Sequence, residues 1–178
     1  MKKALIIVDV QNDFLPEGSL AVPESDKIIP IINKLMKKKK YDLIVFTFDW
    51  HPKNHCSFSI WPEHCIEGTF GSLLSSKLDT PSQEYTFIFK GQNIDVDSYS
   101  GFFDNDHKTK TSLETSLNAK NITNVDIVGL AYNFCVAYTA LDAVKLGFKT
   151  TIIKKATKAI GDYTEIERKM LEKGIKII

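Results

Sequence analysis

One cysteine stands where a thiol could act as a nucleophile. Cys135 follows the apolar run Val125–Val128 and lies at the start of a segment with helical spacing. The positive end of a helix dipole and its free N–H groups favour a thiolate, and the same groups could hold an oxyanion during attack on a carbonyl. The alternative is a small buried apolar residue, which is a common role for cysteine. The position of Cys135 alone does not decide between the two.

Two charged residues stand at the ends of other apolar runs. Lys90 follows Tyr85–Phe89, and Asp9 interrupts Ala4–Val10. A lysine turned inward would stabilise a thiolate or an oxyanion, whereas a lysine facing solvent would have no chemical role. A carboxylate at the end of a buried strand is costly unless it is paired. Asp9 could take a thiol proton and return it to a leaving amine, or it could only cap the N–H groups that follow it.

The long segment 49–80 holds the densest group of potential metal ligands. Asp49, His51 and His55 fall within seven residues, and His64 follows in Trp-Pro-Glu-His-Cys. Carboxylate and imidazole ligands suit zinc, manganese or iron, and a set without full thiolate ligation is typical of catalytic sites. Histidines that only form hydrogen bonds within a loop are a second interpretation. A third is a structural zinc site built from His55, Cys56, His64 and Cys65. The spacing of these residues lacks the pairs that are usual in structural zinc sites.

Three aromatic residues fall in loops that follow predicted strands: Phe14, Trp61 and Tyr99. They could stack on a flat heteroaromatic ring, or they could only cover the core. The segment 49–80 has little regular pattern, and loops of that length are functional or disordered. Disordered segments are poor in aromatic residues. Because both tryptophans of the chain lie in this segment, a functional loop is favoured.

The elements that must position these residues alternate between strands and helices. Continuous apolar runs predict strands covered on both faces, at Ala4–Val10, Leu43–Phe48, Tyr85–Phe89, Val125–Val128, Thr150–Ile153 and Ile175–Ile178. Helical spacing of apolar residues predicts helices over Asp26–Lys40, Thr111–Asn118, Phe134–Leu146 and Thr164–Glu172. This alternation predicts an α/β fold of three layers, α/β/α, with a mostly parallel central sheet in a single domain over residues 1–178.

The predicted sheet would bring the candidate residues together. Ligands of open parallel sheets bind beyond the carboxyl ends of the strands. Asp9, Asp49, Lys90 and Cys135 each lie at or after the end of a different predicted strand. We therefore expect one functional site at this edge of the sheet.

Composition narrows the classes of function. The chain has 178 residues, of which 43% are hydrophobic and 25% charged, with a net charge of +1. We expect no nucleic-acid partner, since the sequence has no basic stripe with interleaved aromatic residues. We also expect no membrane partner, since no apolar stretch reaches the ~20 residues that a membrane span needs. Three cysteines do not make a disulfide framework. We expect a soluble, cytoplasmic protein with a small-molecule partner, either a monomer or a homo-oligomer.

The motifs, taken in order, resemble those of the nicotinamidases within the isochorismatase-like cysteine hydrolases, whose fold is Rossmann-like. The pairing of Asp-x-His-Pro with Trp-Pro-x-His-Cys is the most specific part. The matching segments are Asp9–Phe14, Asp49–Pro52, Trp61–Cys65, Phe89–Gly91, Ser98–Phe102 and Gly129–Val136.

The resemblance implies roles for the site residues. The implied catalytic triad is Asp9, Lys90 and Cys135. The implied metal ligands are Asp49, His51 and His64, with His55 as a candidate fourth. The ion would be one divalent metal, zinc by preference and manganese or iron as alternatives.

The resemblance also implies an oxyanion hole and a ring pocket. The N–H groups of Ala131 and Cys135 would form the hole, after a cis peptide bond preceding Ala131. The ring pocket would be lined by Phe14, Trp61 and Tyr99. One position departs from the family, because Asn133 stands where aspartate is usual. Asparagine is still a good helix cap, but a charge near the thiol is lost.

The implied reaction is hydrolysis of nicotinamide to nicotinate and ammonia through a thioester, a step of NAD salvage, with pyrazinamide as a further substrate. Two alternatives stay open. A related amidohydrolase of the same fold would act on another small amide and would not need the metal site. A catalytically inactive homologue would only bind a small ligand.

Overall fold

A computed structural model describes residues 1–178 and places a six-stranded sheet at the centre. The strands are β1 (Lys2–Val8), β2 (Leu43–Asp49), β3 (Tyr85–Lys90), β4 (Ile122–Leu130), β5 (Lys149–Lys158) and β6 (Lys176–Ile177). Their order is β3-β2-β1-β4-β5-β6, and every neighbouring pair is parallel. The predicted parallel α/β sheet is confirmed.

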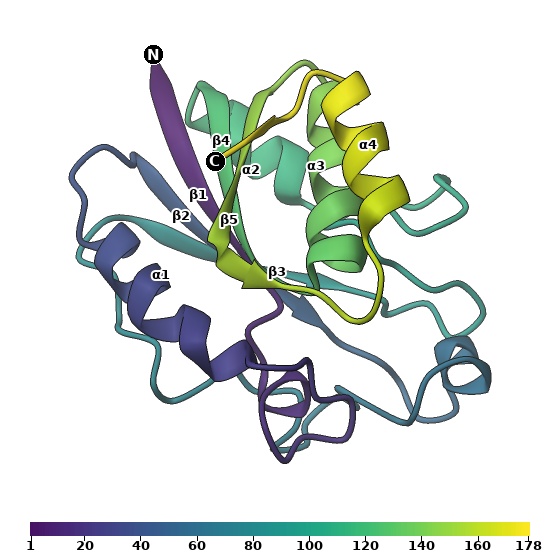
Figure 1. The fold of residues 1–178 in the computed structure, drawn as a ribbon. Coiled ribbons are helices and arrows are strands. Elements are labelled where there is room, and N and C mark those ends of the chain that lie inside the picture. Colours follow the sequence, from purple (N-terminus) through teal and green to yellow (C-terminus); the bar gives the residue numbers. More distant parts are fainter.

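Helices cover the two faces of this sheet (Figure 1). One face packs against α1 (Ile29–Met36), and the other packs against α2 (Leu113–Ala119), α3 (Ala137–Lys145) and α4 (Thr164–Glu172). Side chains of a strand point alternately to its two faces. In β1, Ile6 belongs to one buried cluster while Leu5 and Ile7 belong to the other. The central strand is therefore covered on both sides, as three layers require.

The helix predicted over Thr164–Glu172 has the observed bounds, and the one predicted over Thr111–Asn118 is observed at Leu113–Ala119. The other two differ more in extent. The helix predicted over Asp26–Lys40 begins with a 3-10 turn at Ser25–Ile28 and ends at Met36. The lysines at 37–40 offer no apolar side chain to the core, so nothing extends the helix through them. The helix predicted over Phe134–Leu146 begins instead as a π-helical turn, Tyr132–Val136, and continues as α3.

The prediction that every strand is covered on both faces is wrong for β3. Tyr85, Phe87 and Phe89 are 44%, 47% and 39% exposed, whereas Ile88 and Lys90 are buried. β3 is an edge strand, and a long irregular segment rather than a helix connects it to β2. No helix therefore lies over the outer part of this face.

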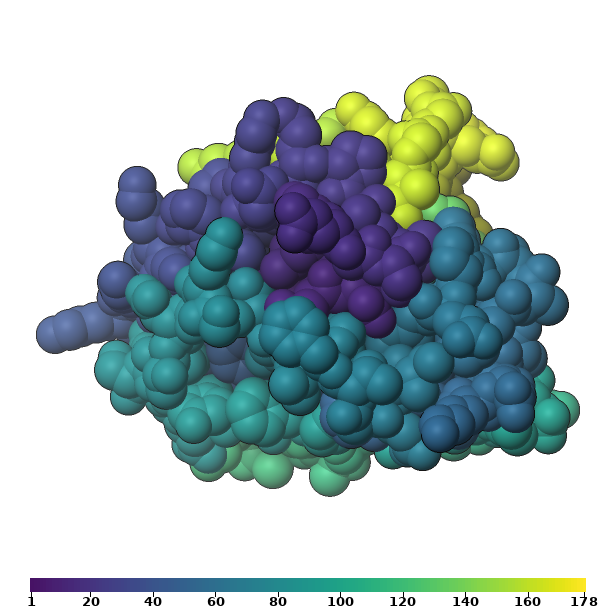
Figure 2. Space-filling model, turned by 90° about the horizontal axis from the view of Figure 1, so that it is seen from below, coloured from purple at the N-terminus to yellow at the C-terminus, as the bar shows by residue number.

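The carboxyl ends of the strands are covered by two segments that are distant in sequence. Figure 2 views the molecule from below Figure 1, and the purple N-terminal segment lies beside the blue and teal segment that follows β2. Asn12 N–H donates to the Leu73 carbonyl at 2.9 Å, and Asp13 N–H donates to the Gly71 carbonyl at 3.0 Å. These bonds order the long segment 49–80 over the sheet edge. None of the helices combines the length and apolar character that crossing a membrane requires.

Candidate active site

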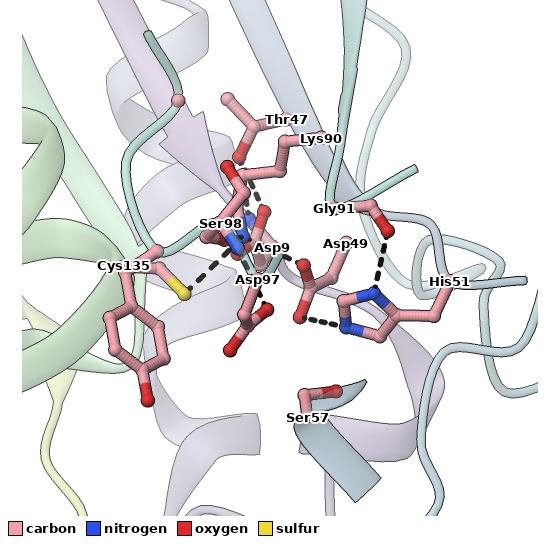
Figure 3. A network of polar contacts seen from close by, with 12 residues as sticks. Asp9, Thr47, Asp49, His51, Ser57, Lys90, Gly91, Asp97, Ser98 and Cys135 are labelled. Atoms are coloured by element: carbon pink, nitrogen blue, oxygen red, sulfur yellow. Dashed lines mark hydrogen bonds and ion pairs between the residues drawn. The ribbon is translucent and has the colours of Figure 1, made fainter. Parts of the chain in front are cut away.

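Lys90 joins residues from four elements at the sheet edge (Figure 3). Its Nζ lies 3.0 Å from Asp9 Oδ2, 2.8 Å from Asp49 Oδ1 and 3.4 Å from Cys135 Sγ. It also donates to the Ser98 carbonyl at 2.8 Å. Parallel pairing places Asp49 directly opposite Lys90. Because the Lys90 side chain is fully buried, its alternative role as a solvent-facing strand end is excluded.

Opposite charges keep Lys90 and Asp49 ionised. Burial alone would lower the pKa of Lys90, but Asp49 and Asp9 outweigh it and hold that pKa well above the usual value. Burial alone would raise the pKa of Asp49, but Lys90 and His51 outweigh it and hold that pKa well below the usual value. A buried charge of this kind is tolerated only because it is paired.

The Cys135 thiol is buried beside two carboxylates. Burial raises its pKa well above the usual value, Asp9 and Asp49 add to the rise, and Lys90 opposes it. Its place at the start of a helical segment predicts the opposite shift, but burial and the carboxylates dominate. Burial also raises the pKa of Asp9, although Lys90 opposes this. Burial thus opposes ionisation of both groups at once, and the proton for which they compete can pass from the Cys135 thiol to the Asp9 carboxylate.

Thr47 fixes the direction of the Asp9 carboxylate. Its hydroxyl donates to Asp9 Oδ1 at 2.5 Å and accepts from the Asp9 N–H at 3.2 Å. Asp9 lies one residue beyond β1, with φ +46°. Sequence reasoning missed Thr47, although a fully buried hydroxyl within the apolar strand β2 was a signal that could have identified it.

Asp49, His51 and His64 bring their ligand atoms together. The three atoms lie within 4.8 Å of one another, and Asp49 Oδ2 is 3.0 Å from His51 Nε2 and 3.4 Å from His64 Nε2. The other ring nitrogen of each histidine contacts a backbone carbonyl, at Gly91 for His51 (2.9 Å) and at Pro62 for His64 (2.7 Å). Such carbonyls fix the tautomer that leaves Nε2 free for a metal.

These residues fit a divalent metal. His51 Nε2 is buried, and its 3.0 Å contact with Asp49 Oδ2 is not a hydrogen bond, which is expected of two ligand atoms of one ion. One carboxylate and two imidazoles leave further positions for water or substrate, as in catalytic zinc sites. The alternative structural zinc site is not assembled, because neither group of converging ligand atoms includes a cysteine.

His55 lies beside this cluster and outside it. Its ring stacks on that of His51, with centroids 4.0 Å apart and an interplanar angle of 19°. Its converging partners are His51 and Asp97, not Asp49 and His64. Asp97 was missed in the sequence, where it is one of several acidic residues in a loop with no motif of its own.

The three predicted aromatic residues line one pocket. Phe14, Trp61 and Tyr99 face it, and Trp61 Nε1 donates to the Tyr99 hydroxyl at 3.2 Å. Phe134, which the sequence analysis did not single out, packs edge-on to Trp61 with ring centroids 5.0 Å apart. Cys135, of the expected triad, and Asp49 and His64, of the candidate metal cluster, also line the pocket. The remaining lining residues are Leu20, Asp97, Ala131 and Ile160.

The turn that carries Cys135 is tied to the segment after β5. The peptide bond Leu130–Ala131 is cis, as expected, and both Ala131 and Cys135 reach the pocket. Asn133 Nδ2 donates to the carbonyls of Ile160 (2.7 Å) and Asp162 (3.1 Å), and its Oδ1 accepts from the Ile160 N–H at 3.1 Å. An aspartate could accept this bond but could not donate the other two as a carboxylate.

Comparison with known proteins gives a consistent result. Residues 3–173 match the isochorismatase domain family. A nicotinamidase of Acinetobacter baylyi is 41% identical, over 98% of this chain and 91% of the relative. A crystal structure of PnC1 from L. infantum in complex with nicotinate has a TM-score of 0.95 and 35% identity, covering 99% of this chain and 92% of that one. A pyrazinamidase of Pyrococcus horikoshii in complex with zinc has a TM-score of 0.89 and 40% identity, covering 100% and 99%.

Proposed function

The chain belongs to the isochorismatase domain family, and from that membership we propose that it hydrolyses nicotinamide to nicotinate and ammonia. Its curated relatives include nicotinamidases of bacteria and yeast. One observation carries the proposal: the Lys90 ammonium contacts Asp9, Cys135 and Asp49 at once. The nucleophile and the metal cluster are thus parts of one site, beside a pocket with aromatic walls. Pyrazinamide, a similar flat amide, is a second substrate of the same pocket.

We assign the chemistry of amide cleavage to three buried residues. Asp9 takes the Cys135 proton as the sulfur attacks the amide carbon, so a thiol that is neutral at rest becomes a nucleophile only during the reaction. The N–H groups of Ala131 and Cys135 hold the oxyanion, and Lys90 adds positive charge beside the sulfur. Asp9 returns the proton to the leaving ammonia. Water then hydrolyses the Cys135 thioester to the acid.

We assign binding of the nicotinamide ring to the aromatic residues of the pocket and to the candidate metal ligands. Phe14, Trp61 and Tyr99 hold the ring against their aromatic faces. Asp49, His51 and His64 would hold a divalent metal, zinc by preference and manganese or iron as alternatives, which when bound supplies a Lewis acid toward the ring nitrogen. His55 stays a candidate fourth ligand, outside the cluster of Asp49, His51 and His64.

The remaining assignments concern the whole chain. We propose that residues 1–178 act as one domain, since both buried clusters lie against the same sheet. Three free cysteines support a reducing, cytoplasmic compartment.

The test is ammonia release from nicotinamide by the purified chain, with and without a chelator. We expect release that the chelator stops and that zinc, manganese or iron restores. Release that persists without metal would remove the metal from the proposal and leave the amidase activity. If no ammonia appears from nicotinamide even after zinc, manganese or iron is added back, the substrate is a different amide or the protein is a binding homologue.

A further inference from the structure

Asp97 is the one carboxylate of the pocket wall that the proposed mechanism does not use. The pocket is lined by two carboxylates, Asp49 and Asp97. Asp49 belongs to the metal cluster, whereas Asp97 lies in the loop between β3 and α2. In Figure 3 its side chain lies between Cys135 and Asp49, and all three residues line the same pocket. Asp97 is therefore placed where it can act on whatever occupies the site.

The backbone around Asp97 holds its side chain in place. Asp97 Oδ1 accepts from the Ser98 N–H at 2.8 Å, and the Asp97 carbonyl accepts from the Asn105 N–H at 2.7 Å. The next carbonyl in the chain, that of Ser98, accepts from Lys90 Nζ. The second carboxylate oxygen, Oδ2, has no protein partner among the hydrogen bonds and ion pairs. One oxygen is thus fixed by the loop, and the other is available to a molecule in the pocket.

Asp97 faces His51 of the metal cluster and the neighbouring His55. One carboxylate oxygen of Asp97 and one ring nitrogen each of His51 and His55 lie within 4.8 Å of one another. Asp97 does not converge with Asp49 and His64, the other two proposed ligands, so its oxygen is placed for contact with the ion through a bridging water rather than for direct ligation. The charge is also of the right sign, because a second carboxylate near a divalent cation stabilises it.

His55 is suited to hydrogen bonding rather than to ligation. Its Nδ1 accepts from the Ser57 N–H at 3.3 Å and lies 2.7 Å from the Ser57 hydroxyl. A neutral ring that accepts at Nδ1 carries its proton on Nε2. An Nε2 with a proton donates to an acceptor and offers no lone pair to a metal. His55 thus lies beside His51 and Asp97 as a hydrogen-bonding residue and not as a ligand.

We propose that Asp97, with His55 beside it, forms an outer shell of the Asp49–His51–His64 metal site and accepts hydrogen bonds from water that completes the metal's coordination. The proposal rests on the proposed function, because it needs a metal on those three residues. Asp97 is a positioning residue in this scheme, since it acts on the metal through water. Outer-shell partners of this kind change metal affinity by about 10–100-fold when they are removed.

The experiment measures metal affinity directly, by competition between the full-length protein and a coloured chelator for zinc. Asp97→Asn keeps the size of the side chain and the acceptor for the Ser98 N–H, but replaces the free oxygen with a donor. Asp95→Asn is the matched control, because Asp95 is an exposed carboxylate of the same loop. We expect zinc affinity to fall about tenfold or more in Asp97→Asn and to stay unchanged in Asp95→Asn. The absorption spectrum of the cobalt-loaded protein should change only in Asp97→Asn.

Two further variants distinguish failure of the outer-shell role from failure of the metal site itself. Asp97→Ser retains a hydroxyl for the Ser98 N–H, and it replaces Asp97→Asn if thermal melting shows that the metal-free Asn variant is unfolded. His51→Ala removes a direct ligand and should weaken zinc binding more than either. If His51→Ala weakens binding but the Asp97 variants bind zinc as the unaltered protein does, the outer-shell role is overturned and the metal site stands. If His51→Ala also binds normally, the proposed metal site fails and the outer shell fails with it.

Discussion

At the scale of single residues, the charges around Lys90 constrain when the nucleophile can form. One ammonium contacts two carboxylates and a thiol, all buried. If Asp9, Asp49 and Cys135 were all ionised, three negative charges would surround one positive charge in a medium that screens them weakly. The raised pKa values of Cys135 and Asp9 avoid this arrangement. A proton therefore stays on the pair at rest and moves only as the sulfur attacks.

Replacing Cys135 tests this arrangement most directly. Cys135→Ala should lower ammonia release by about 10³-fold or more, because in the proposed mechanism the sulfur forms the covalent bond. The free energy of unfolding should change by only about 1 kcal/mol, since a neutral thiol is exchanged for a methyl group. Ammonia assays and urea unfolding measure the two quantities. Substantial release by a folded Cys135→Ala protein would mean that another group attacks the amide.

Gly91 offers a second test at this scale, because its backbone supports His51. A Cβ built there would lie 2.5 Å from His51 Cε1 and 2.7 Å from His51 Nδ1, at φ +67°. Gly91→Ala should displace the ring from the Gly91 carbonyl and weaken zinc binding about tenfold or more. Gly147→Ala is the matched control, with φ +90° and no atom near its Cβ. Both variants should lose about 1 kcal/mol of stability from backbone strain, but equal zinc affinities would show that His51 tolerates the new methyl group.

At the scale of elements, the turn that presents Cys135 depends on a segment 27 residues later. Asn133 bonds both the N–H and the carbonyl of Ile160, and Ile160 lines the pocket. Asn133→Asp should keep the bond from the Ile160 N–H and lose the two donated bonds, leaving carbonyls opposite a carboxylate. We expect a loss of about 1–3 kcal/mol of stability and a higher KM with a smaller change in kcat. Hydrogen exchange at 160–162 measures the loosening directly, and unchanged exchange would contradict this role.

The elements also show what a sequence can predict and where it fails. The apolar runs located all six strands, because buried parallel strands need continuous aliphatic residues. They could not show that one face of β3 is open, since burial of Phe87 depends on which segment crosses above it. The helix after β4 was expected, but its π-helical beginning was not, because the turn depends on bonds from Phe134 and Val136 to the Ala131 carbonyl.

At the scale of the whole molecule, the site residues that could be predicted are those whose positions follow from the order of the strands alone. Asp9, Asp49 and Lys90 end adjacent parallel strands, so any sheet of this order brings them to one edge. Asp97 and Phe134 were not predictable in the same way. Their contacts depend on the path of a loop and of a turn through space, and neither residue stands out by type among its neighbours.

A charge cluster centred on Asp126, in the middle of β4, contributes to stability rather than to chemistry. Asp126 of β4 accepts from Lys3 Nζ at 2.8 Å, Lys40 Nζ at 2.9 Å and the Tyr41 hydroxyl at 2.8 Å. Burial would raise the pKa of Asp126, but these hydrogen bonds outweigh it and lower that pKa. A carboxyl whose pKa is lower in the folded state stabilises the fold above the unfolded pKa of about 3.9. That stabilisation disappears as the pH falls through the folded pKa.

The difference in the free energy of unfolding between Asp126→Asn and the unaltered protein should therefore depend on pH. At pH 7 the variant should be less stable by roughly 1–2 kcal/mol, because the carboxylate that joins three partners is lost. As the pH falls below about 4, Asp126 takes up a proton in the unfolded chain before it does so in the folded protein, so the difference should narrow. Urea unfolding at pH 7, 5 and 3 measures it. Ammonia release by the folded variant at pH 7 should be unchanged, since Asp126 does not line the pocket. A stability difference that stays constant from pH 7 to pH 3 would show that Asp126 contributes through packing and not through its charge.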